Sequence, residues 1–153
     1  MDEINTRILH ELTRDGRISN LHLADRVGLS PSACLRRVQE LEQASVLAGY
    51  TAVLDPAKLG LGLQAFVRVQ LRQHDAATVA AFASFVTAWD EVVACHALTG
   101  DMDYLLHVAV QDLEHFSRFL LDRLLGQAGV ADVNSSFVLR TVKAMRGMPL
   151  PAG

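Results

Sequence analysis

The side chains best suited to binding chemistry lie in a stretch of thirteen residues, Ser30–Glu42, which carries the adjacent arginines Arg36 and Arg37. Ser30 can accept a hydrogen bond from the free backbone N–H groups at a helix start, and Pro31 suits the first helical position. The stretch is therefore predicted to be a helix. An arginine on such a helix can reach the base edges or the phosphates of DNA.

This predicted helix has a narrow apolar seam and an opposite face of short residues plus arginine. On a helical wheel centred on Val38, the seam consists of Cys34, Leu35, Leu41 and Ser45. The face that points away consists of Ser32, Ala33, Arg36, Glu40 and Gln43, with Arg37 on the flank. Short residues let a helix backbone approach the major groove. The pattern therefore fits a DNA-reading helix, but it also fits an amphipathic surface helix with two solvated arginines.

Two shorter helices are predicted before this one. The first covers residues 2–14 and stops at Gly16, and the second covers residues 20–27 with Ser19 as its cap. Gly28 ends the second helix, so a short turn separates it from the next one. This order is that of a helix-turn-helix, in which the second helix of the pair reads DNA. Helix pairs with glycine turns also occur in proteins that never bind DNA.

Positive charge is concentrated in the same region. The whole chain has a net charge of −3, which argues against a protein that coats nucleic acid with a basic surface. From Arg14 to Arg37, however, five arginines oppose two aspartates and leave a local excess of +3. Any DNA contact is therefore expected there, with the acidic remainder of the chain facing away.

The two cysteines, Cys34 and Cys95, have neither the spacing of a metal-binding motif nor the density of a disulfide framework. Both lie among apolar residues, so they are predicted to be buried thiols in a reducing cytosol. No apolar stretch approaches the ~18 residues needed to span a bilayer, and the N-terminus lacks a signal pattern. The protein is therefore expected to be cytoplasmic, with no membrane partner.

The second half alternates between strand and helix patterns in the order β-α-β-β-α-β, which is typical of a ferredoxin-like domain. The strands are predicted at residues 65–71, 92–98, 104–110 and 134–142, and the helices at 76–88 and 113–125. A further β-like segment at 51–54 precedes them. The fold is therefore expected to be α+β, with an N-terminal helix-turn-helix domain joined by a strand linker to a ferredoxin-like βαββαβ domain. The predicted parts are 1–45 (helix-turn-helix), 46–63 (strand and linker), 64–146 (βαββαβ) and 147–153 (tail).

One face of the predicted sheet is left open. In its first strand, Val67, Val69 and Leu71 point to one side, and Phe66, Arg68, Gln70 and Arg72 point to the other. A sheet face that is only partly polar is usually closed by a second copy of the chain. A homodimer is therefore expected.

The order of these parts resembles the Lrp/AsnC family, the feast/famine transcriptional regulators, over residues 2–146. The resemblance rests on motifs at residues 8–12, 15–19, 23–30, 37–42, 49–50 and 59–60, and above all on Thr-Gly-Asp-Met-Asp-Tyr-Leu-Leu at 99–106. The chain departs from the family pattern at Asn5, where an acidic residue is usual, and at His22, where glutamate is usual. It also departs at residues 45–47 and 128–129.

The resemblance implies a regulator that binds double-stranded DNA as a dimer and assembles further, towards an octamer. It implies that the βαββαβ domain senses an amino acid or a similar small metabolite. It places Ser32, Arg36 and Arg37 on the operator, and Arg17 and Ser19 at phosphates. A bidentate arginine–guanine contact contributes about 1–3 kcal/mol of base discrimination, whereas phosphate contacts add affinity without sequence information. Arg36 is expected to read bases and Arg37 to bind phosphate.

The loop Thr99–Asp103 is the effector site that the resemblance implies. Gly100 permits a tight turn with exposed N–H groups that can hold a carboxylate, and Asp101 or Asp103 can receive an α-ammonium group. Two hydroxyls of the last predicted strand are expected to face the same cleft, those of Ser135 and Ser136. The alternative is a plain hairpin turn, because Gly-Asp is favoured turn chemistry.

An enzyme is the competing interpretation, because the ferredoxin-like fold hosts several chemistries. An enzyme needs a nucleophile with a base, or a metal set, in one cleft, and this chain offers only the Asp101/Asp103 pair and scattered histidines. His96 and His107 lack further ligands at fixed spacing, so no metal site is predicted. We therefore expect a sequence-specific regulator that is not an enzyme and has no cofactor besides its effector. An effector-sensing module that does not bind DNA is the alternative that remains.

Overall fold

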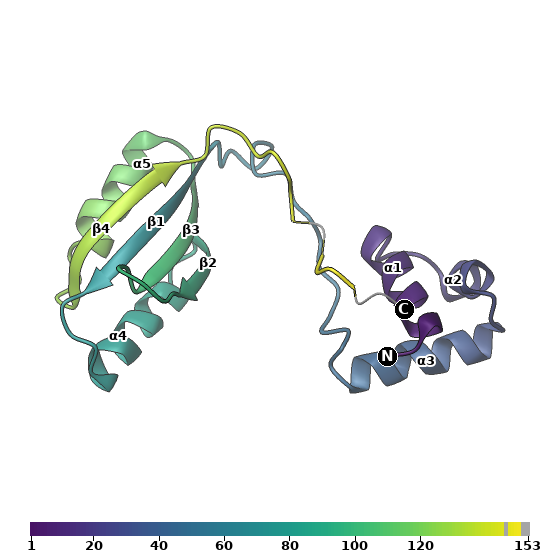
Figure 1. Ribbon diagram of the computed structural model, residues 1–153. Coiled ribbons are helices and arrows are strands. Elements are labelled where there is room, and N and C mark those ends of the chain that lie inside the picture. The colour runs from purple at the N-terminus through teal and green to yellow at the C-terminus, as the bar shows by residue number, and fades with distance from the viewer. Residues whose placement is uncertain (146, 151–153) are drawn as a thin grey trace. The chain divides into compact units, whose positions relative to one another are not determined.

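The computed structural model describes residues 1–145 and 147–150. Contacts divide the chain into two compact units. The helix-turn-helix unit comprises Met1–Val53 with the described residues from Val142 onward, and the sheet unit comprises Leu54–Thr141. Figure 1 shows the helices of the first unit and the sheet, with its own helices, of the second. The functional domain limits given above remain predictions.

Three helices form the helix-turn-helix unit: α1 (Glu3–Arg14), α2 (Asn20–Val27) and α3 (Pro31–Gln43). Each helix is capped by the side chain just before it. Asp2, Ser19 and Ser30 accept hydrogen bonds from N–H groups in the first turns of α1, α2 and α3, respectively. Such caps satisfy backbone donors that have no partner within the helix. The three predicted helices, with their caps at Ser19 and Ser30, are confirmed.

The turn between α2 and α3 depends on Gly28, whose φ of 73° lies in the left-handed region. The next N–H, that of Leu29, bonds back to the carbonyl oxygen of Ala24 at 3.0 Å. A residue with a side chain would be strained at Gly28, so glycine sets the direction in which the chain enters α3.

The apolar seam of α3 packs into the core of this unit. Cys34 is fully buried and Leu41 nearly so, together with residues of α1 and α2: Ile8, Leu9, Leu23, Ala24 and Val27. Leu35 is 47% exposed, so the predicted seam is wrong at this position. The next residue of a helix lies about 100° around its axis, which turns Leu35 away from the side that buries Cys34.

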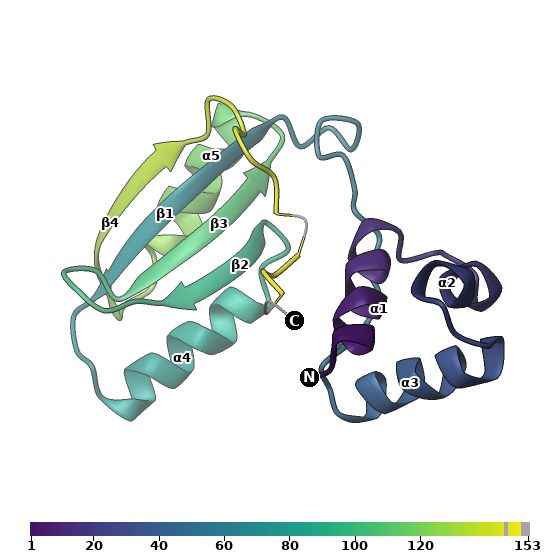
Figure 2. The same ribbon diagram turned by 45° about the vertical axis from the view of Figure 1, so that its right-hand side comes forward.

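The sheet unit has four antiparallel strands in the order β2-β3-β1-β4. Its strands are β1 (Leu63–Leu71), β2 (Val92–Ala97), β3 (Tyr104–Val110) and β4 (Val130–Phe137). Its helices are α4 (Ala76–Thr87), α5 (Leu113–Arg118) and the π-helix η1 (Phe119–Leu124). Figure 2 shows α5 behind the four strands. The predicted α+β class and the β-α-β-β-α-β order are confirmed.

The core of the sheet unit lies between the helices and one face of the sheet. β1 alternates strictly from Ala65, with Val67 and Val69 fully buried and Phe66 and Arg68 exposed on the other face. The buried side packs with aromatic residues of the helices: Phe82, Phe116 and Phe119. Strand alternation thus separates a helix-covered face from an open face.

Two strand predictions are wrong. Residues 51–54 form no strand, and Val53 is 93% exposed. A strand needs a neighbour for its N–H and C=O groups, and this segment pairs with no strand of the described chain. The last strand is Val130–Phe137 rather than 134–142, because it pairs with β1 from Leu71↔Val130 to Ala65↔Phe137.

The segment predicted as one helix at residues 113–125 changes type midway. An α-helical stretch, α5, continues directly into η1. The N–H of Leu125 bonds to the carbonyl oxygen of Leu120 at 2.9 Å, which is the i→i+5 spacing of a π-helix. None of the helices in the part of the chain that the structure describes is long and apolar enough to cross a bilayer.

Candidate DNA-binding face and effector loop

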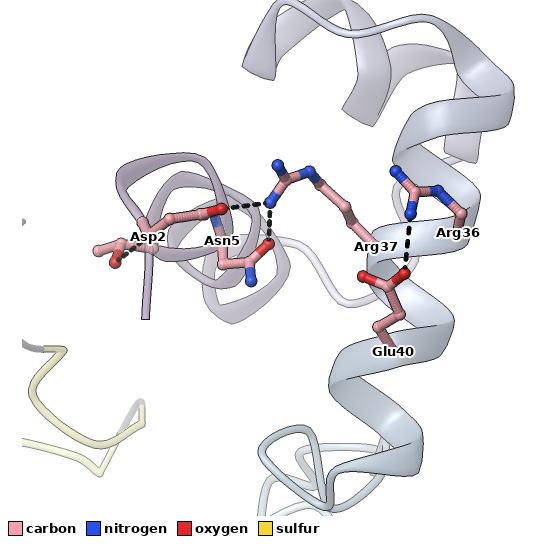
Figure 3. A network of polar contacts seen from close by, with 6 residues as sticks. Asp2, Asn5, Arg36, Arg37 and Glu40 are labelled. Atoms are coloured by element: carbon pink, nitrogen blue, oxygen red, sulfur yellow. Dashed lines mark hydrogen bonds and ion pairs between the residues drawn. The ribbon is translucent and has the colours of Figure 1, made fainter.

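α3 presents Arg36 on its solvent side (Figure 3). The Arg36 Nη1 lies 3.1 Å from Oε1 of Glu40, one turn further along, and the two side chains are 69% and 54% exposed. An exposed pair of this kind contributes only about 0.2–1 kcal/mol, so Arg36 can give it up for a DNA base. Ser32 is also exposed, in the first turn of α3, with its hydroxyl oxygen 3.3 Å from that of Ser30.

Arg37 extends from α3 to the start of α1 (Figure 3). Its Nη1 donates to Oδ2 of Asp2 at 2.6 Å and to Oδ1 of Asn5 at 2.9 Å, and its side chain is only 23% exposed. These charge-assisted bonds tie α3 to α1. The sequence did not indicate this role of Arg37, because its partners lie more than thirty positions away. Its one signal was the unusual residue at Asn5. The phosphate contact of Arg37 remains a prediction.

The Asp2–Arg37 pair makes the helix-turn-helix unit sensitive to acid. A backbone hydrogen bond from Asn5 and a side-chain hydrogen bond from Arg37 hold the pKa of Asp2 below its ordinary value. A carboxyl whose pKa is depressed by folding stabilises the folded state above its unfolded pKa, and this contribution disappears as pH falls through the folded pKa.

We therefore expect Asp2→Asn, which keeps a capping oxygen but loses the charge, to lower the free energy of unfolding near neutral pH. The difference between the variant and the parent protein should shrink as pH falls below 3.8, the ordinary pKa of Asp2, and through its lowered folded pKa. Urea unfolding followed by helical circular dichroism over a series of pH values measures the difference. A difference that is the same at every pH would contradict this role of Asp2.

Arg17 and Ser19 lie where the chain enters α2. Arg17 is exposed, and its backbone N–H donates to Oδ1 of Asp15 at 2.9 Å. The Ser19 hydroxyl accepts the N–H of His22 at 3.3 Å as the cap of α2. Both side chains are on the surface at a helix N-terminus, which is a favourable place for a phosphate.

The predicted local charge excess is partly neutralised by carboxylates from outside the counted stretch. Glu11 lies 2.7 Å from Arg26 and 3.6 Å from Arg14, and other carboxylates pair with Arg36 and Arg37. Arg17 has no ion-pair partner within residues 1–145 and 147–150. Because the guanidinium groups of Arg14, Arg26 and Arg36 are mostly exposed, phosphates can compete for them, whereas Arg37 is largely covered.

In the sheet unit, Asp103 ties the predicted effector loop to the end of β1. Its Oδ2 accepts the N–H of Leu71 at 2.7 Å, and its Oδ1 lies 2.7 Å from Nε2 of His74. The hydrogen bond from Leu71, and then that with His74, lower the pKa of Asp103. Its carboxylate is therefore already engaged within the chain. Asp101 is exposed.

The rest of the loop is open to solvent. Gly100 has a φ of 114°, in agreement with the tight turn predicted there, and Thr99 is exposed beside it. Ser135 and Ser136 lie on opposite faces of the sheet, since Ser135 pairs with buried Val67 and Ser136 with exposed Phe66. The expectation that both face one cleft is wrong, because successive strand residues alternate.

The open face of the sheet carries an aromatic contact. The rings of Phe66 and His107 stack with centroids 4.8 Å apart, and Nε2 of His107 lies 2.9 Å from Oε1 of Gln64. Burial lowers the pKa of His107, which favours the neutral ring. On the same face Arg68 donates to Asn134 at 3.0 Å. This face thus combines aromatic surface with polar groups that already have partners.

A pocket of about 390 Å³ lies elsewhere in the sheet unit. It is lined by α4 and the segment before β4, including Thr78, Phe82, Phe85 and Gly129. None of the predicted effector residues lines it. In a single chain the predicted effector site is therefore a surface loop.

The cysteines and histidines occupy different environments. Cys34 is buried as predicted, whereas Cys95 is exposed, because β2 is an edge strand of the sheet. His96 and His107 are both on strands and face the same side as Phe66 and Leu105. Among the described residues, no three side chains of the metal-binding types gather as a metal site.

Family models match both units. Residues 1–42 match the AsnC-type helix-turn-helix domain, and residues 64–148 match the Lrp/AsnC ligand binding domain. Together the two matches cover most of the chain, in the order in which the structure presents the three helices and the sheet.

Full-length relatives and solved structures show the same likeness. The chain is 41% identical over 143 residues to the leucine-responsive regulatory proteins of Klebsiella pneumoniae and Escherichia coli K12, covering 94% of this chain and 87% of each relative. A Neisseria meningitidis transcriptional regulator solved in complex with L-Met superposes with a TM-score of 0.94, at 45% identity over 97% of this chain and 96% of that one. An AsnC family regulator from Agrobacterium tumefaciens superposes with a TM-score of 0.91, at 32% identity over 97% of both chains.

Proposed function

This chain belongs to the Lrp/AsnC family of transcriptional regulators, and on that premise we propose which of its residues read DNA and which sense the effector. It is a DNA-binding regulator of transcription that responds to an amino acid. α3 enters the major groove, with Arg36 and Ser32 towards the bases. Arg17, Ser19 and Arg37 lie towards phosphates. The observation that carries this assignment is the exposed guanidinium of Arg36, on the side of α3 opposite buried Cys34.

The effector is an amino acid held at the loop Thr99–Asp103. Exposed backbone N–H groups around Gly100 suit its carboxylate, and the exposed Asp101 suits its α-ammonium group. The L-Met complex of the Neisseria meningitidis relative supports this class of ligand. Because Asp103 is already bonded to Leu71 and His74, its part is to hold the loop in shape. Ser136 is the better placed of the two serines for a ligand on the open face.

Calorimetry against the twenty amino acids, together with the variants Asp101→Ala and Asp103→Ala, tests the site. We expect Asp101→Ala to weaken effector binding and to leave the unfolding midpoint unchanged. Asp103→Ala should weaken binding and also destabilise the sheet unit by about 1 kcal/mol, because the Leu71 N–H loses its acceptor. If both variants bind as tightly as the parent protein, the loop is not the effector site.

The open face of the sheet forms the interface of a homodimer, and dimers assemble further, towards an octamer. The stacked Phe66–His107 pair supports this, because Phe66 is 41% exposed on a face that no helix of the described chain covers. A second copy would remove this aromatic surface from water. The regulator works in the cytoplasm, is not an enzyme, and takes no cofactor besides its effector.

Phe66→Glu is expected to turn the dimer into a monomer at micromolar concentration, because it buries a charge without a partner in the interface. Phe85→Glu is the matched control, since Phe85 is 43% exposed but lies on α4. Light scattering measures both. A Phe66→Glu protein that stays dimeric, or a Phe85→Glu protein that dissociates, would place the interface elsewhere.

DNA upstream of the protein's own gene provides the test of regulation. Fluorescence anisotropy with a labelled fragment, titrated with and without the amino acid found by calorimetry, should show a change in affinity. By linkage, the DNA should alter the affinity for the amino acid by the same factor. Binding to DNA that is unaffected by every amino acid would contradict the sensing role but leave the DNA-binding role intact.

A further inference from the structure

The chain returns to the helix-turn-helix unit after its last strand. The described residues from Val142 onward group with α1, α2 and α3, whereas Leu54–Thr141 forms the sheet unit. The sheet unit is therefore inserted between two stretches of the helix-turn-helix unit. Two polypeptide connections join the units, one before the sheet unit and one after it.

Two residues of the returning segment make defined contacts. Leu150 is partly buried and packs against the apolar core of the helix-turn-helix unit, as Leu47 does. Gly147 lies against the last turn of α1: a Cβ built on it would be 3.4 Å from Cγ2 and 3.7 Å from Cβ of Thr13. Its φ of +136° also disfavours a side chain. The neighbouring Met148 is 71% exposed, so not every residue of the segment packs against the unit.

We propose that the described residues after Thr141, 142–145 and 147–150, form an intramolecular strap on the helix-turn-helix unit, anchored by Gly147 on Thr13 and by Leu150 on the apolar core. The strap holds α1 in place. Because Arg37 of α3 is bonded to Asp2 and to the first turn of α1, holding α1 also holds the reading helix. The strap is thereby a second connection from the sheet unit towards α3, in addition to the linker that precedes the sheet unit.

The docking does not depend on the proposed function, but its effect on DNA reading does. A chain segment that is fixed at both ends closes a loop. Closing a loop reduces the number of conformations open to the unit that the segment crosses, and a single linker does not do this. A strap that comes loose should therefore leave the sheet unit folded and make α1 and α3 more mobile.

A disulfide tests the docking directly. The 3.7 Å between the two Cβ positions lies within the range of about 3.5–4.5 Å found in disulfides. In a Cys95→Ser background, Thr13→Cys with Gly147→Cys should form a bond within one chain on mild oxidation, seen as a faster-migrating monomer on a non-reducing denaturing gel. Thr13→Cys alone in the same background, which leaves buried Cys34 as the only other cysteine, should form none.

Two results of that experiment would overturn the proposal. A covalent dimer would show that the segment docks on a second copy of the chain. No disulfide at all would show that residue 147 does not remain near Thr13, provided that Gly147→Cys alone leaves helical circular dichroism and deuterium uptake in α1 unchanged.

Charge substitutions test the consequence for the reading helix. Leu150→Asp should increase deuterium uptake in α1, because a carboxylate cannot stay in an apolar core, whereas Met148→Asp should leave uptake unchanged. Leu150→Asp should also weaken binding to the upstream DNA several-fold, and Met148→Asp should not. Equal uptake in the parent and Leu150→Asp proteins, or equal DNA affinity, would refute the holding role. If the parent protein binds no DNA, the proposed function fails, while disulfide formation and deuterium uptake still decide the docking.

Discussion

Arg36→Ala is expected to reduce the preference of this protein for its own operator over random DNA by roughly 5- to 150-fold. The estimate is the loss of one bidentate arginine–guanine contact, about 1–3 kcal/mol of base discrimination. The structure supports it because the Arg36 guanidinium is mostly exposed on α3. Among the residues that the structure describes it is bonded only to Glu40, and solvent weakens that pair. Competition binding with cognate and random fragments at one salt concentration measures the loss.

Arg17→Ala is the control for this prediction. A side chain that contacts only phosphate should reduce affinity for specific and random DNA by the same factor. Equal losses on both kinds of DNA for Arg36→Ala would assign Arg36 to the backbone and leave base reading to another residue of α3.

Leu106→Ala is expected to destabilise the sheet unit by about 2–5 kcal/mol, the cost of removing a large side chain from a close-packed core. Leu106 lies on β3, is fully buried, and belongs to the apolar core between the sheet and its helices. Trp89 is the single tryptophan of the chain and packs edge-on against Phe119 in the same core, with ring centroids 5.6 Å apart. Tryptophan fluorescence during urea unfolding therefore reports on the sheet unit alone.

Ile8→Ala is the matched variant in the other unit, where Ile8 of α1 is also fully buried. It should lower the unfolding midpoint seen by helical circular dichroism and leave the Trp89 fluorescence transition in place. If Leu106→Ala and Ile8→Ala shift both signals together, the two units unfold as one, and the expected independence of their stabilities would be wrong.

Local patterns were enough to predict the helices of the first unit. Capping residues such as Ser19 and Ser30, and a stop at Gly28, act within a few positions of the chain, so their effects can be deduced from the sequence. The alternation of β1 similarly predicts which side chains are buried. The family resemblance added the order of the parts and the identity of the candidate loop.

Features that depend on distant partners could not be predicted in this way. β4 ends at Phe137 because β1 sets the length of the ladder, and residues 51–54 form no strand because nothing pairs with them. The contacts of Asp103 with Leu71 and His74 join residues about thirty positions apart, and no local motif predicts them. The same holds for Arg37 and Asp2, so an arginine expected to bind phosphate also joins α3 to α1.

The salt dependence of binding to the protein's own upstream DNA tests the central claim most directly. If two copies each contact about three phosphates, the slope of log K against log salt concentration should be about −5, and affinity should fall steeply between about 50 and about 200 mM salt. The cognate fragment should remain preferred to random DNA throughout. A slope near zero, or equal affinity for both fragments at every salt concentration, would contradict the assignment of α3 as a sequence-reading helix.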